Sequence, residues 1–101
     1  MIFPTAQYAI ECALRRCGAD SYSTGLFEDK NIRIKPVFTA LLENKGIPEE
    51  EKNAVREALD GQRAYRFVAG DGTEMCIIIM PFGEGFFAWL KNLRTSAIFK
   101  L

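Results

Sequence analysis

The fold is decided by the stretch Arg63-Ala-Tyr-Arg-Phe-Val-Ala-Gly-Asp-Gly-Thr-Glu-Met-Cys-Ile-Ile-Ile-Met80, which predicts two β-strands joined by a tight turn. Residues 70–72 (Gly-Asp-Gly) supply the turn, because glycine and aspartate tolerate the positive φ angles that short hairpin loops need. The flanking residues are rich in aromatic and β-branched side chains, which strands favour. We therefore expect an antiparallel hairpin of strands 63–69 and 74–80.

The second strand of this hairpin is predicted to lie at the centre of a sheet. Residues 75–80 are apolar without interruption, so both faces and both edges of the strand should be covered. The first strand alternates between a mixed side and a mostly apolar side, which suits an edge. The central strand then needs a second neighbour. Residues 31–35 alternate well enough to supply it, and residues 97–101 are the alternative.

Four helices are predicted around the sheet. Residues 5–17 place apolar side chains at helical spacing and end at Gly18. The other three helices are 36–45, which begins at a proline, 48–60, which begins at a proline and an acidic first turn, and 85–95, in which Phe86, Leu90 and Leu93 share one side. The predicted fold class is therefore α+β, with a small three-stranded antiparallel sheet (31–35, 63–69, 74–80) and four helices.

The order of these elements over residues 5–80 resembles the winged helix-turn-helix domain in connectivity. The resemblance is one of topology and rests on no sequence motif. It implies a DNA-binding transcriptional regulator, whose third helix would enter the major groove. Residues 48–60 carry five acidic side chains against two basic ones, a net charge of −3, which phosphates would repel. DNA binding is therefore the second hypothesis for function, and a solvated acidic helix face is the plainer interpretation.

Length and composition favour one domain over residues 1–101. The chain has 49% apolar residues, and its 13 basic side chains balance 13 acidic ones. No long-range field therefore attracts nucleic acid or acidic lipid. No apolar stretch approaches the ~18 residues of a membrane span, and the first residues lack a secretory pattern. Three cysteines cannot all pair within one chain, so we expect a reducing, cytoplasmic location.

The sequence carries no recognisable catalytic, cofactor or metal signature. Histidine is absent, which excludes His-based catalysis and His-ligated zinc. Cys12 and Cys17 are too far apart for a paired C-x-x-C zinc site. Residues 83–88 match G-x-G-x-x-A, but too little chain follows for a dinucleotide fold. A carboxylate-based active site stays open, because acids distant in sequence can converge in space. No catalytic residue, cofactor or metal is predicted.

The segment 85–101 is the candidate interaction surface. It contains three basic residues, no acidic residue and a concentration of aromatics that one helix face could not bury. Aromatic and arginine side chains dominate binding energy in protein interfaces. The predicted partner-binding residues are Phe87, Trp89, Arg94 and Phe99, with Glu49, Glu50 and Glu51 as a secondary acidic patch. The opposite charges of the two segments also allow reciprocal pairing in a homodimer.

These observations predict a non-enzymatic, macromolecule-binding protein that acts through protein-protein contacts. Compact chains without a cofactor motif are typical of phage or bacterial accessory factors such as inhibitors, immunity proteins and adaptors. That association comes from size and composition and not from any residue.

Overall fold

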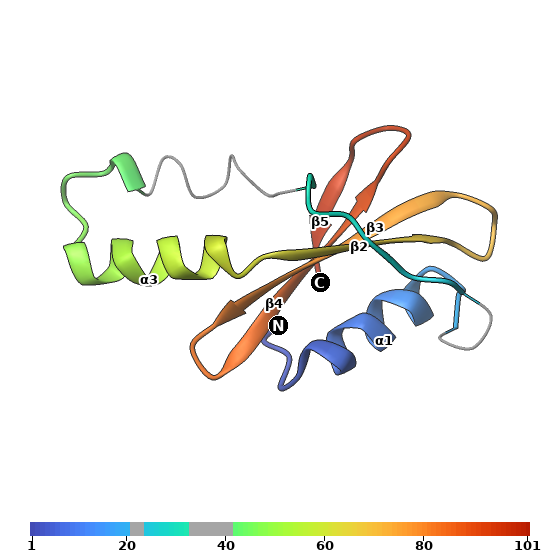
Figure 1. The fold of residues 1–101 in the computed structure, drawn as a ribbon, viewed down its shortest axis with the longest axis horizontal. Coiled ribbons are helices and arrows are strands. Elements are labelled where there is room, and N and C mark those ends of the chain that lie inside the picture. Colours follow the sequence, from blue (N-terminus) through green and yellow to red (C-terminus); the bar gives the residue numbers. More distant parts are fainter. Residues whose placement is uncertain (21–23, 33–41) are drawn as a thin grey trace.

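The computed structural model describes residues 1–20, 24–32 and 42–101. These residues form a five-stranded antiparallel sheet and two α-helices (Figure 1). The helices are α1 (Ala6–Arg16) and α3 (Glu49–Asp60), and the strands are β1 (Phe27–Glu28), β2 (Arg63–Val68), β3 (Glu74–Phe82), β4 (Gly85–Asn92) and β5 (Ile98–Lys100). The spatial order β1-β2-β3-β4-β5 follows the sequence, so each strand pairs with the strands nearest to it along the chain.

The predicted hairpin is confirmed as β2 and β3, but the expected edge position of its first strand is wrong, because β2 also pairs with β1. Their register places Tyr65 opposite Ile77. At the turn the Ala69 N–H donates to the Thr73 carbonyl at 2.8 Å, and Gly72 has a φ of 88°. A positive φ is the conformation that glycine adopts without steric cost. The Gly-Asp-Gly signal therefore located this turn correctly.

Strand β3 occupies the centre of the sheet, as its apolar sequence predicted. It pairs with β2 on one side and β4 on the other. Cys76, Ile77 and Ile78 are fully buried, and every residue from 75 to 80 is buried. Because successive side chains point to opposite faces, an uninterrupted apolar strand needs cover on both faces.

Helix α1 covers one face of the sheet, below it in Figure 1. Its start is capped by Thr5, whose Oγ1 accepts a hydrogen bond from the Tyr8 N–H at 3.0 Å. It is followed by Gly18 with a φ of 66°, as the sequence predicted. The core on this face consists of Ile10, Ala13, Leu14, Phe67, Met75, Ile77, Ile79 and Leu90. The predicted helix 5–17 is thus confirmed. We call this face of the sheet the α1 side.

Helix α3 lies at the other face and extends away from the sheet (Figure 1). The predicted helix 48–60 is confirmed, with Pro48 as its N-cap residue and three glutamates in its first turn. Only Val55 and Ala58 of this helix are buried. The core on this face, called the α3 side below, consists of Ala58, Ala64, Cys76, Ile78, Met80 and Trp89.

The predicted helix 85–95 is wrong, because this segment forms β4. Phe82 pairs with Gly85, so residues 83 and 84 make a two-residue hairpin loop. Gly83 has a φ of 62°, the conformation that such loops require at their first central position. The aromatic residues that no helix face could bury are divided between the two faces of a strand. The i, i+4, i+7 spacing of Phe86, Leu90 and Leu93 was therefore accidental.

The predicted three-stranded sheet and the winged-helix-like connectivity are also wrong. The place beside β3 that was assigned to residues 31–35 is filled by β4. Residues 33–35, and residues 36–41 of the predicted helix 36–45, lie outside the described residues, whereas Leu42 and Glu43 are helical. A winged helix has no β3-β4-β5 meander after its hairpin. The hypothesis of a transcriptional regulator was inferred from that connectivity and therefore loses its structural basis.

Candidate functional site

Strand β5 forms one edge of the sheet and is bonded to β4 through alternate residues. The Asn92 N–H donates to the Ala97 carbonyl at 2.8 Å, and the Leu101 N–H donates to the Ala88 carbonyl at 2.9 Å. In an antiparallel ladder, alternate residues direct both backbone groups toward the same neighbour. The odd-numbered residues 97, 99 and 101 therefore face β4.

The same alternation turns the backbone groups of Ile98 and Lys100 away from β4. Among the described residues no strand pairs with this outer side, because the spatial order ends at β5. An unpaired row of N–H and C=O groups is a template for adding another strand. We call the outer side of residues 98–100 the β5 edge.

Apolar side chains are exposed along the β5 edge. Ile98 is 44% exposed and Phe99 is 43% exposed. Phe99 lies on the α1 side, where the Arg16 guanidinium is 5.7 Å from its ring centroid. Ile98 and Lys100 lie on the α3 side, where the Lys100 ammonium is 4.3 Å from the centroid of Phe87. Each face of this edge therefore combines an exposed apolar group with a cation.

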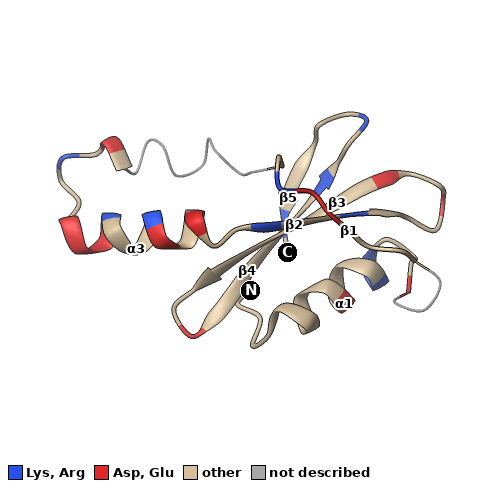
Figure 2. Cartoon of the chain, in the orientation of Figure 1, with Lys and Arg blue, Asp and Glu red and all other residues tan. Residues whose placement is uncertain are grey.

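The loop between β4 and β5 holds Arg94 at the surface. The Asn92 carboxamide oxygen accepts hydrogen bonds from the N–H groups of Arg94 and Thr95, at 2.9 and 3.1 Å. Ser96 has a φ of 64°, and its N–H donates to the Asn92 carbonyl at 2.8 Å. This closed loop fixes the direction in which β5 returns along β4. In Figure 2 the β4–β5 hairpin carries basic and uncharged residues only.

Two predicted partner-binding residues lie mostly within the fold. Trp89 is 6% exposed and belongs to the α3-side core. Phe87 is half-buried, with its ring centroid 6.1 Å from that of Trp89 and 5.0 Å from that of Phe82. Phe99 projects to the opposite face of the sheet. The structure therefore does not unite these aromatics in one exposed patch, although it brings Phe87 and Lys100 together.

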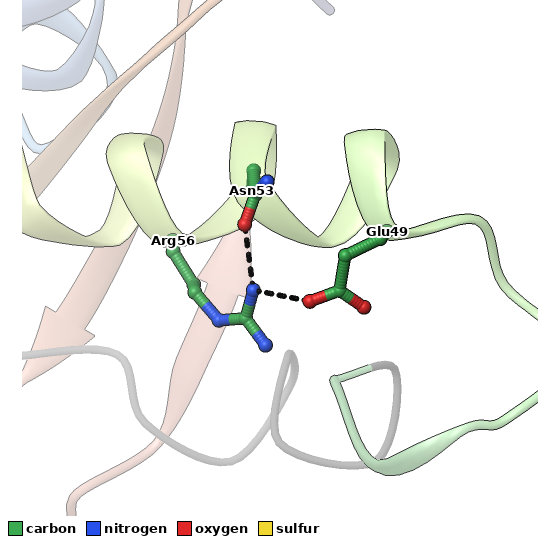
Figure 3. Close-up of polar contacts among 3 residues, drawn as sticks. All are labelled: Glu49, Asn53 and Arg56. Carbon is green, nitrogen blue, oxygen red and sulfur yellow. Dashed lines mark hydrogen bonds and ion pairs between the residues drawn. The ribbon is translucent and has the colours of Figure 1, made fainter.

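The secondary acidic patch, Glu49 to Glu51, lies at the end of α3 that is farthest from the sheet (Figure 2). All three side chains are exposed. The Arg56 Nη1 donates to Asn53 Oδ1 at 2.7 Å and to Glu49 Oε1 at 3.1 Å (Figure 3). The pair with Glu49 is exposed on both sides and adds little stability. This patch is separate from the β5 edge.

Sequence reasoning missed Ile98 and Lys100 as surface residues and Phe27 as an exposed apolar side chain. Phe27 is 71% exposed on the short strand β1 at the other edge of the sheet. Residues 97–101 had been noted as a possible strand. The signal that could have placed them was the Gly-Glu pair before Gly85, which predicts a hairpin and hence a neighbouring strand β4 for β5 to join.

A cavity of about 620 Å³ lies beside β2 and near the start of α1. Its lining includes Asp29, Lys30, Asp60, Arg63 and Tyr65, so acidic and basic groups are mixed. The Asp29 and Asp60 carboxylates therefore share this cavity with the cations of Lys30 and Arg63.

The cysteines are free thiols, and two of them are suppressed as nucleophiles. Burial, with a smaller effect of the Asp29 carboxylate, raises the pKa of Cys76 to about 11. Burial and the Asp71 carboxylate raise the pKa of Cys17, against the lowering effect of Arg16. The thiolate is the reactive form, so neither thiol is activated at neutral pH.

Within residues 1–20, 24–32 and 42–101, no cluster of Cys, Asp or Glu side chains could hold a metal ion. The same ranges contain no helix with the length and apolarity needed to cross a bilayer. Fold and surface together define a small α+β protein built on an open antiparallel sheet. No protein-family model, curated protein or solved structure matches the chain.

Proposed function

We propose that this chain is a non-enzymatic protein-binding factor that contacts its partner through the β5 edge. The observation that carries the proposal is one short strand that exposes Ile98 and Phe99 and whose outer backbone groups have no strand partner among the described residues. Exposed sheet edges bind extended segments by adding a strand, in which main-chain hydrogen bonds give affinity and side chains give specificity. Phe99 and Arg94, which the sequence selected, belong to this surface.

Phe87 and Trp89 contribute indirectly in this proposal. The Phe87 ring lies beneath Lys100 and packs edge-on against Trp89, so the two rings support the α3 side of the edge. The acidic patch at Glu49 to Glu51 is a second contact region, distant from the first. A factor with two separated contact regions fits the adaptor or inhibitor type that the composition suggested. Three free cysteines support a cytoplasmic location.

The test compares capture of partner proteins from the native host by the tagged chain and by two variants. Ile98→Pro removes an outward N–H and leaves the hydrogen bonds to β4 intact, because proline is tolerated at an edge on its solvent side. Ile98→Ala shortens the side chain and keeps the N–H. We expect one partner, identified by the mass of the intact complex, to bind the wild type, to bind Ile98→Ala more weakly and to be lost with Ile98→Pro.

Circular dichroism and thermal unfolding of both variants provide the control for folding. If the folded Ile98→Pro protein captures the same partner as the wild type in the same amount, the β5 edge is not the binding surface. If turnover of a small molecule follows the purified chain and is lost with a carboxylate variant near the cavity beside β2, the non-enzymatic assignment is wrong.

A further inference from the structure

Basic side chains lie on both faces of the sheet beside the β5 edge. Arg16 lies over Phe99 on the α1 side, and Lys100 and Lys91 lie on the α3 side, where Lys91 is directly opposite Ile98. Arg94 is exposed in the adjoining loop. In the part of the chain that the structure describes, none of these four cations forms an ion pair. The segment 85–101 contains no acidic residue.

The alternation of β5 sets what a partner strand would meet on each face. A strand paired with β5 would place one side chain beside Phe99 on the α1 side and its two neighbours beside Ile98 and Lys100 on the α3 side. The first position is apolar, while Lys100 and Lys91 border the other two. An alternating apolar and acidic sequence matches this arrangement.

We infer that the β5 edge receives an extended acidic segment of a partner protein, which adds to the sheet as a further strand. This inference rests on the protein-binding function proposed above and specifies the chemistry of the partner. Hydrogen bonds would form with the outward backbone groups of Ile98 and Lys100. Acidic side chains of the partner would pair with Lys100 and Lys91, and an apolar side chain would cover Phe99.

A second copy of this chain is a poorer occupant of the same edge. A two-fold axis at Phe99 would pair β5 with itself in good backbone register, since Ile98 of each copy would face Lys100 of the other. It would also bring two segments of charge +3 together without an acidic residue in either. The acidic patch of the chain is helical and lies at the far end of α3, so it cannot supply the added strand.

The experiment measures fluorescence anisotropy of a labelled Glu-Val-Glu-Val-Glu-Val-Glu peptide titrated with the full chain. A Lys-Val peptide of the same pattern and a short oligothymidylate are the matched probes. We expect the Glu-Val peptide to bind, and the Lys-Val peptide and the oligonucleotide not to bind. Added salt should weaken binding, because exposed charges are screened beyond about 10 Å at 0.1 M ionic strength.

Two variants locate the binding. Lys100→Glu should weaken the affinity by at least about threefold through loss of one attraction and gain of one repulsion. Ile98→Pro should abolish binding although it changes no charge. Equal binding of the oligonucleotide, or undiminished binding by Ile98→Pro, would overturn the inference, because either result indicates a general polyanion surface. Concentration-dependent dimerisation that Ile98→Pro abolishes would assign the edge to a second copy instead.

The outcomes also separate this inference from the proposed function. Failure of the acidic peptide to bind, with capture of a host protein still lost in Ile98→Pro, would leave the β5 edge as the binding surface and reject only the acidic strand. If the peptide fails and Ile98→Pro captures normally, both proposals are wrong.

Discussion

The Lys100 ammonium lies 4.3 Å from the centroid of the Phe87 ring, and this contact ties β5 to β4 on the α3 side of the sheet. On the α1 side the Arg16 guanidinium lies 5.7 Å from the ring of Phe99. A cation over an aromatic face is attracted by the ring quadrupole. The three-residue strand β5 is therefore held from both faces, which compensates for its short ladder.

Removing the Lys100 charge should loosen this strand. We expect Lys100→Met, which keeps the apolar stem, to lower the free energy of unfolding by roughly 0.5–1 kcal/mol, the value of an exposed cation–π contact. Lys100→Arg is the matched control and should stay close to the wild type. Urea unfolding followed by tryptophan fluorescence measures both. Equal stability of Lys100→Met and Lys100→Arg would show that the contact contributes nothing.

Trp89→Ala should destabilise the whole fold, although the residue was selected from the sequence as a surface contact. Its side chain is 6% exposed and packs with Cys76, Ile78 and Met80. Truncation of a buried tryptophan costs about 3–5 kcal/mol. Phe99→Ala, at an exposed position, should cost far less. Thermal unfolding distinguishes them, and a Trp89→Ala protein as stable as Phe99→Ala would contradict the buried position of the ring.

Raising the pH should weaken the fold through Cys76. Burial, and then the Asp29 carboxylate, raise the pKa of this thiol from 9.0 to about 11 in the folded protein, against the lowering effect of Lys91. Above pH 9 the unfolded state ionises first, so it binds fewer protons than the folded state. The stabilisation from the neutral thiol is therefore complete below pH 9 and is lost as the pH rises to about 11.

Cys76→Ala isolates this effect, since other groups titrate in the same range. The difference in free energy of unfolding between wild type and Cys76→Ala should be constant below pH 9 and should shrink from pH 9 to 11. Urea unfolding at several pH values measures the difference. A gap that stays constant over the whole range would mean that the Cys76 thiol is not protected from ionisation.

Gly70→Ala should separate α1 from the β2–β3 turn. The Gly70 N–H donates to the Cys17 carbonyl at 2.9 Å, and a Cβ at residue 70 would lie 3.1 Å from the Gly18 carbonyl carbon and collide with its oxygen. Because the Gly18 backbone can move aside only at an energetic cost, we expect the free energy of unfolding to fall by about 1–3 kcal/mol. Gly25→Ala is the control, because a Cβ there meets no atom of the described residues within 4 Å. Equal melting temperatures for the two variants would refute this close approach.

The parts of the fold that could be predicted are those with local signals. A few neighbouring residues were enough to predict three features: the Gly-Asp-Gly turn, the apolar strand β3 and the start of α3 at Pro48. Helix α1 was predicted from the helical spacing of Ile10, Ala13 and Leu14. These elements are confirmed within one or two residues at each end, as expected where pattern and propensity agree.

The part that could not be predicted is the segment 85–101, where two periodicities compete. Phe86, Leu90 and Leu93 suggest a helix, whereas the same segment in a strand buries Ala88 and Leu90 on one face and Trp89 on the other. The competition is resolved by pairing with β3, which lies outside the segment itself. Tertiary context overrides local spacing in such cases.

The wrong helix prediction for residues 85–95 also misplaced the candidate interaction surface. In a helix, Phe87 and Trp89 would lie outside the apolar stripe of residues 86, 90 and 93, and this surplus of aromatics suggested a binding surface. In strand β4 the pairing with β3 buries Trp89 and brings Lys100 of β5 over Phe87. The exposed surface therefore shifts from β4 to β5, and only Arg94 and Phe99 of the selected residues remain exposed near it.

Amide hydrogen exchange at residues 98–101, followed by NMR, tests the central claim most directly. In the free protein we expect the N–H groups of Phe99 and Leu101, which face β4, to exchange slowly and those of Ile98 and Lys100 to exchange fast. Binding of the partner or of the acidic peptide should slow exchange at Ile98 and Lys100. Slow exchange at those two amides in the free monomer, or no change on binding, would contradict the assignment of the β5 edge as the docking surface.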